Sequence, residues 1–411
     1  MSNSEVDIKA DTETMDDGES EGLMEPLLIH GSSRHRTDIN DLVVDLVARS
    51  SSFRHSLPEG VLKSLADLVR SMNCYYSNLI EGHNTHPIDI ERALKNDYSA
   101  DTRKRNLQTE AKAHIAVQKW IDDGGLLGRA TTKDGIIEIH RRFCKELPED
   151  LLYVEQPDTK ERLLVTPGEL RTSYVEVGRH VPVSPGSLTR FFDRFEEAYT
   201  GLGKADTIVA VAGAHHRFLW IHPFLDGNGR VARLMSHAML LETLNTGSIW
   251  SVSRGLARDE KAYKEHLRAC DMERRNDLDG RGNLSEEALA EFTRFFLEIC
   301  LDQIKFMESL IELKQLRERI LAWASKEIQA GELPAKSAKV LETILYRGEL
   351  PRGEIAEIVG SGERQARRVT SALIEKEVVT SKSMRASLRL AFPARLASQW
   401  MPGLFPEQVG E

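Results

Sequence analysis

Apolar residues recur along most of this chain at the three- and four-residue spacing of an amphipathic helix. Leu42, Val43 and Leu46 indicate a first helix, and a second is expected from Pro58 to Gly82. Further helices are expected at 107–122, 133–145, 187–202, 206–219, 230–244 and 285–329, the last either unbroken or broken once. The pattern therefore predicts a mainly α-helical protein.

Two segments depart from the helical pattern. Residues 164–185 contain several Gly and Pro residues around the β-prone run 173–177, which predicts a short hairpin or flap. Residues 331–334, Gly-Glu-Leu-Pro, mark a domain boundary. Beyond this boundary, helical stretches are expected at 336–346, 352–359 and 362–375, followed by a two-stranded wing at 378–392. This order of elements is the plan of a winged helix-turn-helix.

These boundaries divide the chain into five parts. Residues 1–36 are acidic and poor in aromatic side chains, so we expect them to be a disordered tail. The other parts are an N-terminal helical region at 37–125, a central domain with a connecting helix at 126–330, a winged helix domain at 334–395 and a C-terminal tail at 396–411.

Composition limits the class of protein. The 411 residues carry a formal net charge of -9, which argues against wholesale polyanion binding but leaves room for a local basic patch. The four cysteines are scattered without a C-x-x-C pair, which favours a reduced, cytoplasmic setting. No apolar run has the length of a membrane span, and the first residues lack the apolar region of a signal peptide. We expect neither export nor membrane insertion.

Residues 222–233 concentrate the chemistry of the chain, reading His-Pro-Phe-Leu-Asp-Gly-Asn-Gly-Arg-Val-Ala-Arg. His222 is a candidate base, and Asp226 offers the hard oxygen ligand that Mg²⁺ prefers. The turn Gly227, Asn228 and Gly229 can direct backbone N–H groups at phosphate oxygens, at the start of an expected helix. Arg230 and Arg233 lie three apart, on one helical face. The glycine spacing also imitates a dinucleotide fingerprint, but no hydrophobic strand precedes it.

This stretch resembles the signature of the Fic family, and the resemblance extends over roughly residues 40–330. It implies a helical domain that transfers AMP from ATP to a Ser, Thr or Tyr hydroxyl of a protein. In this resemblance His222 is the general base and Asp226 the Mg²⁺ ligand. Gly227, Asn228 and Gly229 form the anion cradle, Arg230 binds the β-phosphate, and Arg233 binds the γ-phosphate.

A second element, Ser77-Asn78-Leu79-Ile80-Glu81-Gly82, resembles the inhibitory motif of the same family. Ser77 and Glu81 lie four apart and share one helical face. The resemblance implies that Glu81 binds Arg233 and takes the place of the γ-phosphate, so that the enzyme is inactive at rest. In some relatives the same glutamate is thought to help remove AMP, and the sequence leaves both roles open.

The segment 164–185 resembles the flap with which the family docks its target. Four residues at its tip are also assigned to the nucleotide site: Val177, Gly178, Arg179 and His180. Tyr263 corresponds to a residue that contacts the nucleoside in relatives, and Asp271 falls where some relatives have an asparagine near the adenine.

The sequence is also compatible with other activities and partners. Doc-like relatives transfer phosphate and others transfer phosphocholine, but Doc-like members have lysine where this chain has Gly229. Self-modification and a homodimer are further possibilities. A DNA-binding regulator is the rival from another class, because basic residues are expected on the third helix and the wing of the C-terminal domain: Arg364, Arg367, Arg368, Lys382 and Arg385.

Overall fold

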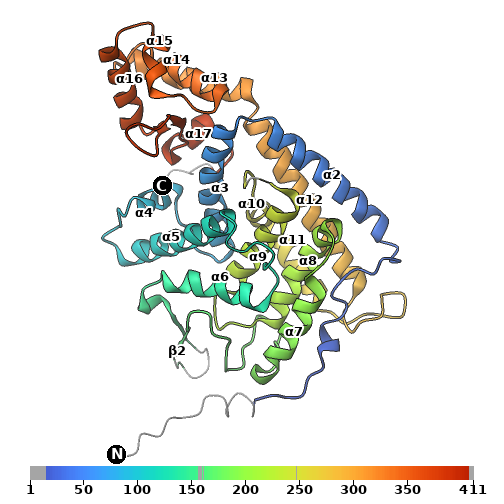
Figure 1. The fold of residues 1–411 in the computed structure, drawn as a ribbon. Helices are drawn as coiled ribbons and strands as arrows, with labels where there is room; N and C mark the ends of the chain where they lie inside the picture. The colour runs from blue at the N-terminus through green and yellow to red at the C-terminus, as the bar shows by residue number, and fades with distance from the viewer. Residues whose placement is uncertain (1–14, 156–159, 161, 247, 407–411) are drawn as a thin grey trace, which may run out of the picture.

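The computed structural model describes residues 15–155, 160, 162–246 and 248–406. It is a bundle of helices with a smaller helical unit at the C-terminal end, which lies beside α3 (Figure 1). At the centre lie α8 (Lys204–Ile221) and α9 (Asn228–Leu244), which pack against each other. Most side chains of these two helices are buried, which explains why their sequences lack a continuous polar face. The loop between them is residues 222–227.

The N-terminal helices cover one side of this pair. They are α2 (Arg36–His55), α3 (Glu59–Ile80), α4 (Pro87–Leu94) and α5 (Thr102–Asp122). Helix α3 begins after Pro58, as expected, and ends where Gly82 adopts a φ of 80°. The His83 N–H donates to the Asn78 carbonyl at 2.8 Å, and the Gly82 N–H donates to the Leu79 carbonyl at 2.9 Å. These bonds satisfy the last turn of α3 and set the position of Glu81.

The remaining helices of the bundle complete the shell. They are α6 (Lys133–Lys145), α7 (Leu188–Tyr199), α10 (Val252–Arg258), α11 (Glu260–Cys270), α12 (Glu286–Leu310) and α13 (Leu313–Gln329), with short 3₁₀ turns η2 (Glu149–Leu151) and η3 (Pro185–Ser187). The long helix expected at 285–329 is broken once, between α12 and α13. Within the described residues, no helix combines the length and the apolar character needed to cross a bilayer.

The expected strand at 173–177 is wrong. The hairpin lies earlier, where β1 (Tyr153–Glu155) pairs antiparallel with β2 (Arg162–Leu164), so that Val154 faces Leu163. In the expected segment only one isolated bridge forms, between Val177 and His180. The Arg171 guanidinium accounts for this difference, because it takes the carbonyls of Ser173 and Val183 and holds the segment against the 222–227 loop. The backbone carbonyls of this segment thus find their hydrogen-bond donor in a side chain and not in a neighbouring strand.

The expectation of a disordered tail at 1–36 is wrong for residues 15–36, and residues 1–14 lie outside the described part. A 3₁₀ turn, η1 (Glu21–Met24), precedes α2, and Met24, Leu27 and Ile29 are buried in the core. Low overall hydrophobicity predicted disorder, but three well-spaced apolar side chains anchor the segment. In Figure 1 it passes α7 on its way to α2.

The C-terminal unit has the expected order of elements. It contains α14 (Ser337–Arg347), η4 (Arg352–Glu354), α15 (Ile355–Val359), α16 (Glu363–Glu375), and the antiparallel pair β3 (Val379–Thr380) and β4 (Arg389–Leu390), then η5 (Ala394–Leu396) and α17 (Ala397–Trp400). Three helices followed by a hairpin fit a winged helix-turn-helix, and assignment to that class stays a prediction. Residues 396–406 are not a free tail, because Trp400 and Leu404 are buried.

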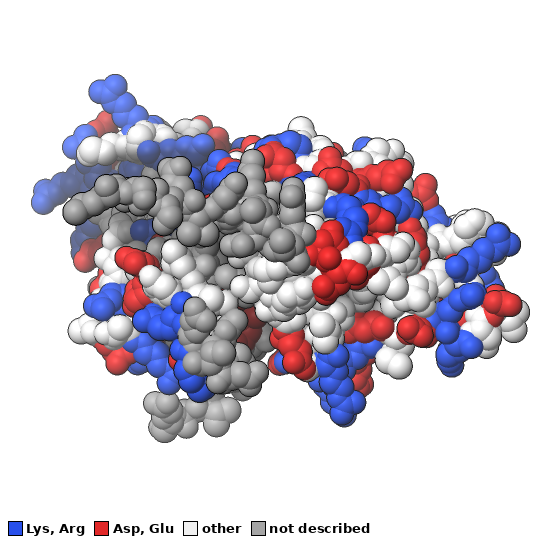
Figure 2. Space-filling view, turned by 90° about the horizontal axis from the view of Figure 1, so that it is seen from below, with Lys and Arg blue, Asp and Glu red and all other residues white. Residues whose placement is uncertain are grey.

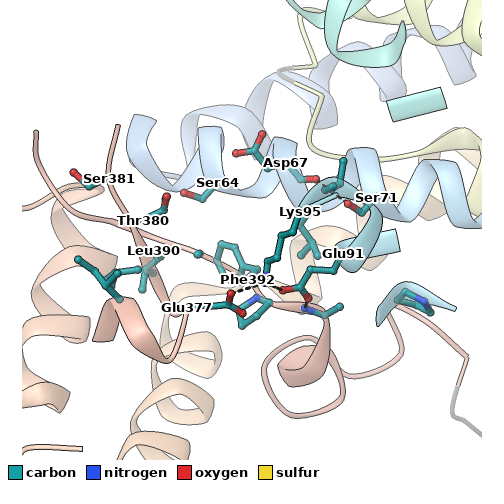
Figure 3. A pocket seen from close by; sticks show the side chains of 18 of the residues that line it. Ser64, Asp67, Ser71, Glu91, Lys95, Glu377, Thr380, Ser381, Leu390 and Phe392 are labelled. Atoms are coloured by element: carbon teal, nitrogen blue, oxygen red, sulfur yellow. Dashed lines mark hydrogen bonds and ion pairs between the residues drawn. The ribbon is translucent and has the colours of Figure 1, made fainter. Parts of the chain in front are cut away.

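The C-terminal unit packs on the helices that precede the central domain. The Tyr76 hydroxyl on α3 donates to the Leu404 carbonyl at 3.0 Å, and the Tyr75 ring meets Phe405 edge to face. A cavity of about 760 Å³ lies between α3, α4 and the β3–β4 hairpin. Figure 3 shows Lys95 reaching toward Glu91 and Glu377, which joins α4 to the turn between α16 and β3.

Candidate active site

The loop at 222–227 is held in a fixed shape by its own residues. His222 ends α8 in the left-handed region, with φ 49°, and Gly227 has φ 81° before α9 begins. The Asn228 side chain bonds both polar groups of Phe224, accepting from its N–H at 3.1 Å and donating to its carbonyl at 2.8 Å. The Phe224 ring is fully buried and stacks on His140 at 3.9 Å. Phe224 is therefore the anchor of the loop.

His222 lies in a mostly enclosed place that keeps its imidazole neutral. Its backbone carbonyl accepts a hydrogen bond from Arg171 Nε at 2.8 Å. Burial, together with the positive charge of Arg171, lowers the pKa of His222 to about 4. A neutral imidazole near pH 7 is the state that a general base requires.

The N-terminus of α9 offers an anion site directly after the loop. Among the described residues, the backbone N–H groups of residues 227–230 have no hydrogen-bond acceptor. Unpaired N–H groups at the start of a helix, with the positive end of the helix dipole, favour phosphate binding. Asn228 contributes only its backbone here, because its side chain is committed to Phe224.

Asp226 is the residue available for a metal ion. Its side chain is exposed, one position before the left-handed Gly227. In the described part of the chain, no group of three or more His, Cys, Asp or Glu side chains is arranged to hold a metal. A single carboxylate beside a phosphate site nevertheless fits Mg²⁺, which commonly binds through one or two carboxylates, waters and substrate phosphates.

Arg233 is buried and occupied by residues of α3. Its Nε donates to Ser77 Oγ at 2.8 Å, and its Nη2 donates to the Ser77 carbonyl at 3.2 Å and forms an ion pair with Glu81 Oε1. Burial opposes ionisation of Glu81, but the charges of Arg233 and Arg230 outweigh it and hold the Glu81 pKa below its ordinary value. The ion pair between Glu81 and Arg233 that the sequence predicted is present, so a carboxylate lies on the candidate γ-phosphate clamp.

Gly229 leaves the space that the Glu81 carboxylate occupies. A Cβ at position 229 would come within 2.5 Å of Glu81 Oε1 and 3.1 Å of Arg233 Nη1. Glycine at this position therefore permits both a close approach of phosphate and the contact with Glu81.

The geometry agrees with the comparison with known families. The Fic/DOC family model matches residues 130–240, which include the loop and most of α9. Residues 130–240 form a Fic/DOC domain. A curated protein of Drosophila grimshawi, "Protein adenylyltransferase Fic", is 29% identical over 170 residues, which are 41% of this chain and 32% of that protein. The protein of the same name from Drosophila yakuba is 28% identical over 185 residues, covering 44% of this chain and 34% of that one.

These alignments span about a third of the curated relatives, so they describe the domain rather than the whole chain. Among solved structures, Fic-1 from C. elegans aligns with 68% of this chain and 74% of its own, with a TM-score of 0.50 and 17% identity. At this identity the likeness shows the fold alone.

A second carboxylate lies near the 222–227 loop, and no sequence motif indicated it. Glu110, on α5, accepts from Arg230 Nη2 at 3.2 Å and from His83 Nδ1 at 2.8 Å. The hydrogen bond to Glu110 raises the pKa of His83 above its ordinary value, although burial opposes the shift. Both phosphate-clamp candidates of the Fic domain, Arg230 and Arg233, thus meet a carboxylate from the N-terminal helices. No motif spacing could reveal this contact, because 120 positions separate Glu110 from Arg230.

Tyr263 and Asp271, the candidates for contact with the nucleoside, both lie against histidines of α8. Tyr263 is buried and its hydroxyl is 2.7 Å from His215 Nε2, and burial raises the pKa of Tyr263 to about 12. Asp271 lies 2.9 Å from His216 Nε2. His215 and His216 are both buried, which agrees with a core role. Contact of Tyr263 or Asp271 with a nucleoside stays a prediction.

The flap candidates lie on the surface beside the Fic loop. Val177, Gly178 and Arg179 are exposed, and His180 Nε2 is 2.7 Å from the Trp220 carbonyl of α8. This contact places His180 against the scaffold. The positions of the other three leave them free to meet a ligand or a protein chain.

Proposed function

We propose that this protein transfers AMP from ATP to a hydroxyl group of a protein and that Glu81 keeps it inactive at rest. The observation that carries the proposal is the arrangement at the start of α9. A neutral His222, an exposed Asp226, unpaired backbone N–H groups and two buried arginines converge within twelve residues. The relatives named protein adenylyltransferase support the reaction class.

In the proposed reaction His222 takes the proton of the attacking hydroxyl as its oxygen bonds to the α-phosphorus of ATP. The bond from that phosphorus to the bridging oxygen breaks, and pyrophosphate leaves. Backbone N–H groups at the α9 N-terminus, with Arg230 and Arg233, hold the phosphates and stabilise the developing charge. Mg²⁺, held by Asp226 and phosphate oxygens, would neutralise charge on the leaving group. Positioning and charge stabilisation supply most of the rate in such a transfer.

The resting state follows from the α3 contacts. Arg233 cannot bind a γ-phosphate while Glu81 and Ser77 hold its guanidinium. ATP must compete with a carboxylate that is tethered and already ionised, so a fraction of molecules far below one half is active. Removal of AMP with help from Glu81 is a second role that this geometry also permits.

The test is labelling with radiolabelled ATP and Mg²⁺. We expect weak self-labelling of the unmodified protein. Labelling should increase about tenfold or more in Glu81→Gly, since freeing Arg233 removes a competing contact of at least about 1.4 kcal/mol. No labelling is expected in the double variant Glu81→Gly/His222→Ala. Glu81→Gln is the matched variant that keeps side-chain length and removes only the charge. Silence of Glu81→Gly toward itself and toward lysate proteins would contradict the proposal.

Mass spectrometry of the modified protein separates AMP from other groups. The space at Gly229 favours a full phosphate chain over the Doc-like reaction. A mass increase equal to AMP supports the proposal, whereas an increase equal to phosphate or phosphocholine contradicts it.

DNA binding by the C-terminal unit is a second candidate function. The five basic candidates are all exposed, three at the start of α16 and two on the turn between β3 and β4: Arg364, Arg367, Arg368, Lys382 and Arg385. Exposed cations on a helix and an adjoining wing suit contacts to phosphates. A gel shift on random duplex DNA at low salt, repeated with Arg364 and Arg368 changed to Glu, tests it. Absence of any shift at low salt would remove this function.

A further inference from the structure

The ordered acidic segment at residues 15–25 lies against the flap side of the Fic domain. The Ser184 N–H and hydroxyl both donate to the Glu19 carboxylate, each at 2.6 Å. The Asp17 N–H donates to Ser184 Oγ at 3.1 Å, and the Tyr174 hydroxyl donates to Asp17 Oδ1 at 3.0 Å. The receiving side chain is well built, because Ser184 is only 1% exposed.

Two arginines of α7 also contact this segment. Arg190 Nη2 donates to Asp16 Oδ1 and to the Glu19 carbonyl, both at 2.8 Å, and Arg194 Nε donates to Glu25 Oε1 at 3.0 Å. The hydrogen bond from Arg190 is the main reason that the pKa of Asp16 lies below its ordinary value. On the face seen from below, acidic and basic side chains lie side by side (Figure 2). We call the residues that receive 15–21 the flap-side surface: Tyr174, Ser184, Gly186 and Arg190.

The flap-side surface is connected to the catalytic loop through one guanidinium. Arg171 donates to the Val183 carbonyl at 2.5 Å and to the His222 carbonyl at 2.8 Å. Val183 immediately precedes Ser184, so a chain bound at Ser184 lies next to the backbone that adjoins His222. Exposed apolar side chains of the flap, Tyr174 and Val177, border the same region.

The part of the segment that contacts this surface is held mainly by polar groups. Apolar anchoring begins at Met24, which is fully buried, whereas residues 16–21 contribute carboxylates and backbone groups. Their partner Arg190 keeps 30% side-chain exposure, so water and salt compete with its ion pairs. A short polar segment of this kind belongs to the parts of a protein that open locally at low free-energy cost.

We propose that the flap-side surface is a docking site for an extended acidic segment of the protein target and that residues 15–21 are its resting occupant. The partner chemistry follows from the groups that residues 15–21 contact: the Arg190 guanidinium, the buried Ser184 hydroxyl, which donates to a carboxylate, and the Gly186 N–H, which donates to the Met15 carbonyl at 3.3 Å. This proposal rests on the proposed function in one respect, that the acceptor is a protein.

Peptide binding tests the surface without ATP or turnover. A fluorescent peptide with the sequence of residues 15–20 is titrated by anisotropy into the full chain and into a chain lacking residues 1–20. The truncated chain should bind the peptide saturably. The full chain should bind roughly 100-fold more weakly, since a tethered competitor acts at about millimolar effective concentration against a peptide Kd of about 10 μM.

Matched variants define which groups bind. In the truncated chain Arg190→Glu should weaken peptide binding about tenfold or more. A peptide with Asp and Glu replaced by Asn and Gln should not bind, because both changes remove the charge pairs. Lys204→Glu on the neighbouring α8 is the charge control and should leave the affinity within about twofold. Full-length Asp16→Asn/Glu19→Gln keeps the whole chain and should bind the peptide more tightly than the unmodified protein, which guards against misfolding of the truncated form.

Equal affinity of the full and truncated chains, or no effect of Arg190→Glu, would overturn the proposal. Peptide binding without any AMP transfer would support the docking site and contradict the proposed function instead. AMP transfer to a target that the peptide does not compete with would refute the docking site and leave the proposed function standing. Circular dichroism of each variant confirms that the fold is retained.

Discussion

At the scale of single residues, the site is organised around two arginines that both face carboxylates. Arg233 meets Glu81, which the sequence pointed to, and Arg230 meets Glu110, which it did not. The Arg230 Nε is buried and has no hydrogen-bond partner among the described residues, so this guanidinium is incompletely satisfied. A buried charge that lacks partners gains more from a polyanionic ligand than a fully bonded one does.

We predict that Glu110→Gln makes ATP binding tighter in the Glu81→Gly background. The change removes the negative charge that competes with phosphate for Arg230, while an amide oxygen still accepts from His83. The KM for ATP should fall by about threefold or more at unchanged protein stability, measured by labelling kinetics and thermal unfolding. Glu146→Gln, an exposed residue at the end of α6, is the matched control. A KM that rises would instead mean that Glu110 orients Arg230 for phosphate.

We predict an acid limb of activity well below the ordinary histidine range. Burial and Arg171 lower the pKa of His222 to about 4, so most of the imidazole is neutral and able to accept a proton once the pH is about one unit above that value. The kcat/KM of Glu81→Gly, which reports the free enzyme, should therefore stay level to about pH 5 and fall as the pH approaches 4. A loss of activity centred near pH 6.5 in folded protein would contradict this environment for His222.

At the scale of elements, the end of α3 decides where the Glu81 carboxylate lies. Ser77 and Glu81 are on one face of α3, and the left-handed Gly82 stops the helix directly after Glu81. Ser77 and Glu81 then contact α9, and Tyr75 and Tyr76 contact the C-terminal residues from the preceding turn. One helix thus links the candidate phosphate site to the C-terminal unit.

We predict that Gly82→Ala loosens this helix end. A φ of 80° costs an alanine about 1–2 kcal/mol, and no atom lies within 4 Å of the added Cβ, so backbone strain is the only local effect. Stability should fall by about that amount in denaturant unfolding, and self-labelling should rise as Glu81 loses its fixed position. Gly353→Ala is the control, because its Cβ also meets open space but its φ is not positive. Equal effects of both changes would refute the role of Gly82.

At the scale of the whole molecule, both ends of the described chain pack back onto the bundle. Residues 15–25 lie against the flap side, and residues 400–405 lie against α3, α10 and α13. Arg254 on α10 donates to the Gly403 carbonyl at 2.9 Å, and Trp400 meets Trp323 of α13 edge to face. The C-terminal residues therefore join the connecting helix to the helix that carries Glu81.

We predict that deletion of residues 401–411 lowers Tm by about 5 °C or more. It removes the buried Met401 and Leu404 side chains, each worth about 1.5–3 kcal/mol, and the acceptors of Tyr76 and Arg254. Deletion of 407–411 alone is the matched control, since it removes none of these contacts. Calorimetry measures both, and equal Tm values for the two deletions would show that these contacts contribute little.

Several elements could be predicted from the sequence because their determinants are local. The apolar periodicity gave α6 at its observed bounds, and α8 and α9 within two residues at each end. The strand expected at 173–177 failed because β propensity cannot anticipate Arg171, whose guanidinium takes the carbonyls of Ser173 and Val183. Disorder at 15–36 failed because burial of Met24 and Leu27 depends on a core built by distant helices.

The sequence by itself determined the mainly helical fold and the position of the candidate site at residues 222–233, since helix periodicity and motif spacing are properties of neighbouring residues. The tertiary structure alone decided that Glu110 reaches Arg230, that Glu81 fills the space beside Gly229, and that residues 15–25 lie on the flap side. These contacts join residues more than a hundred positions apart. Their existence depends on how whole helices pack, which no local pattern encodes.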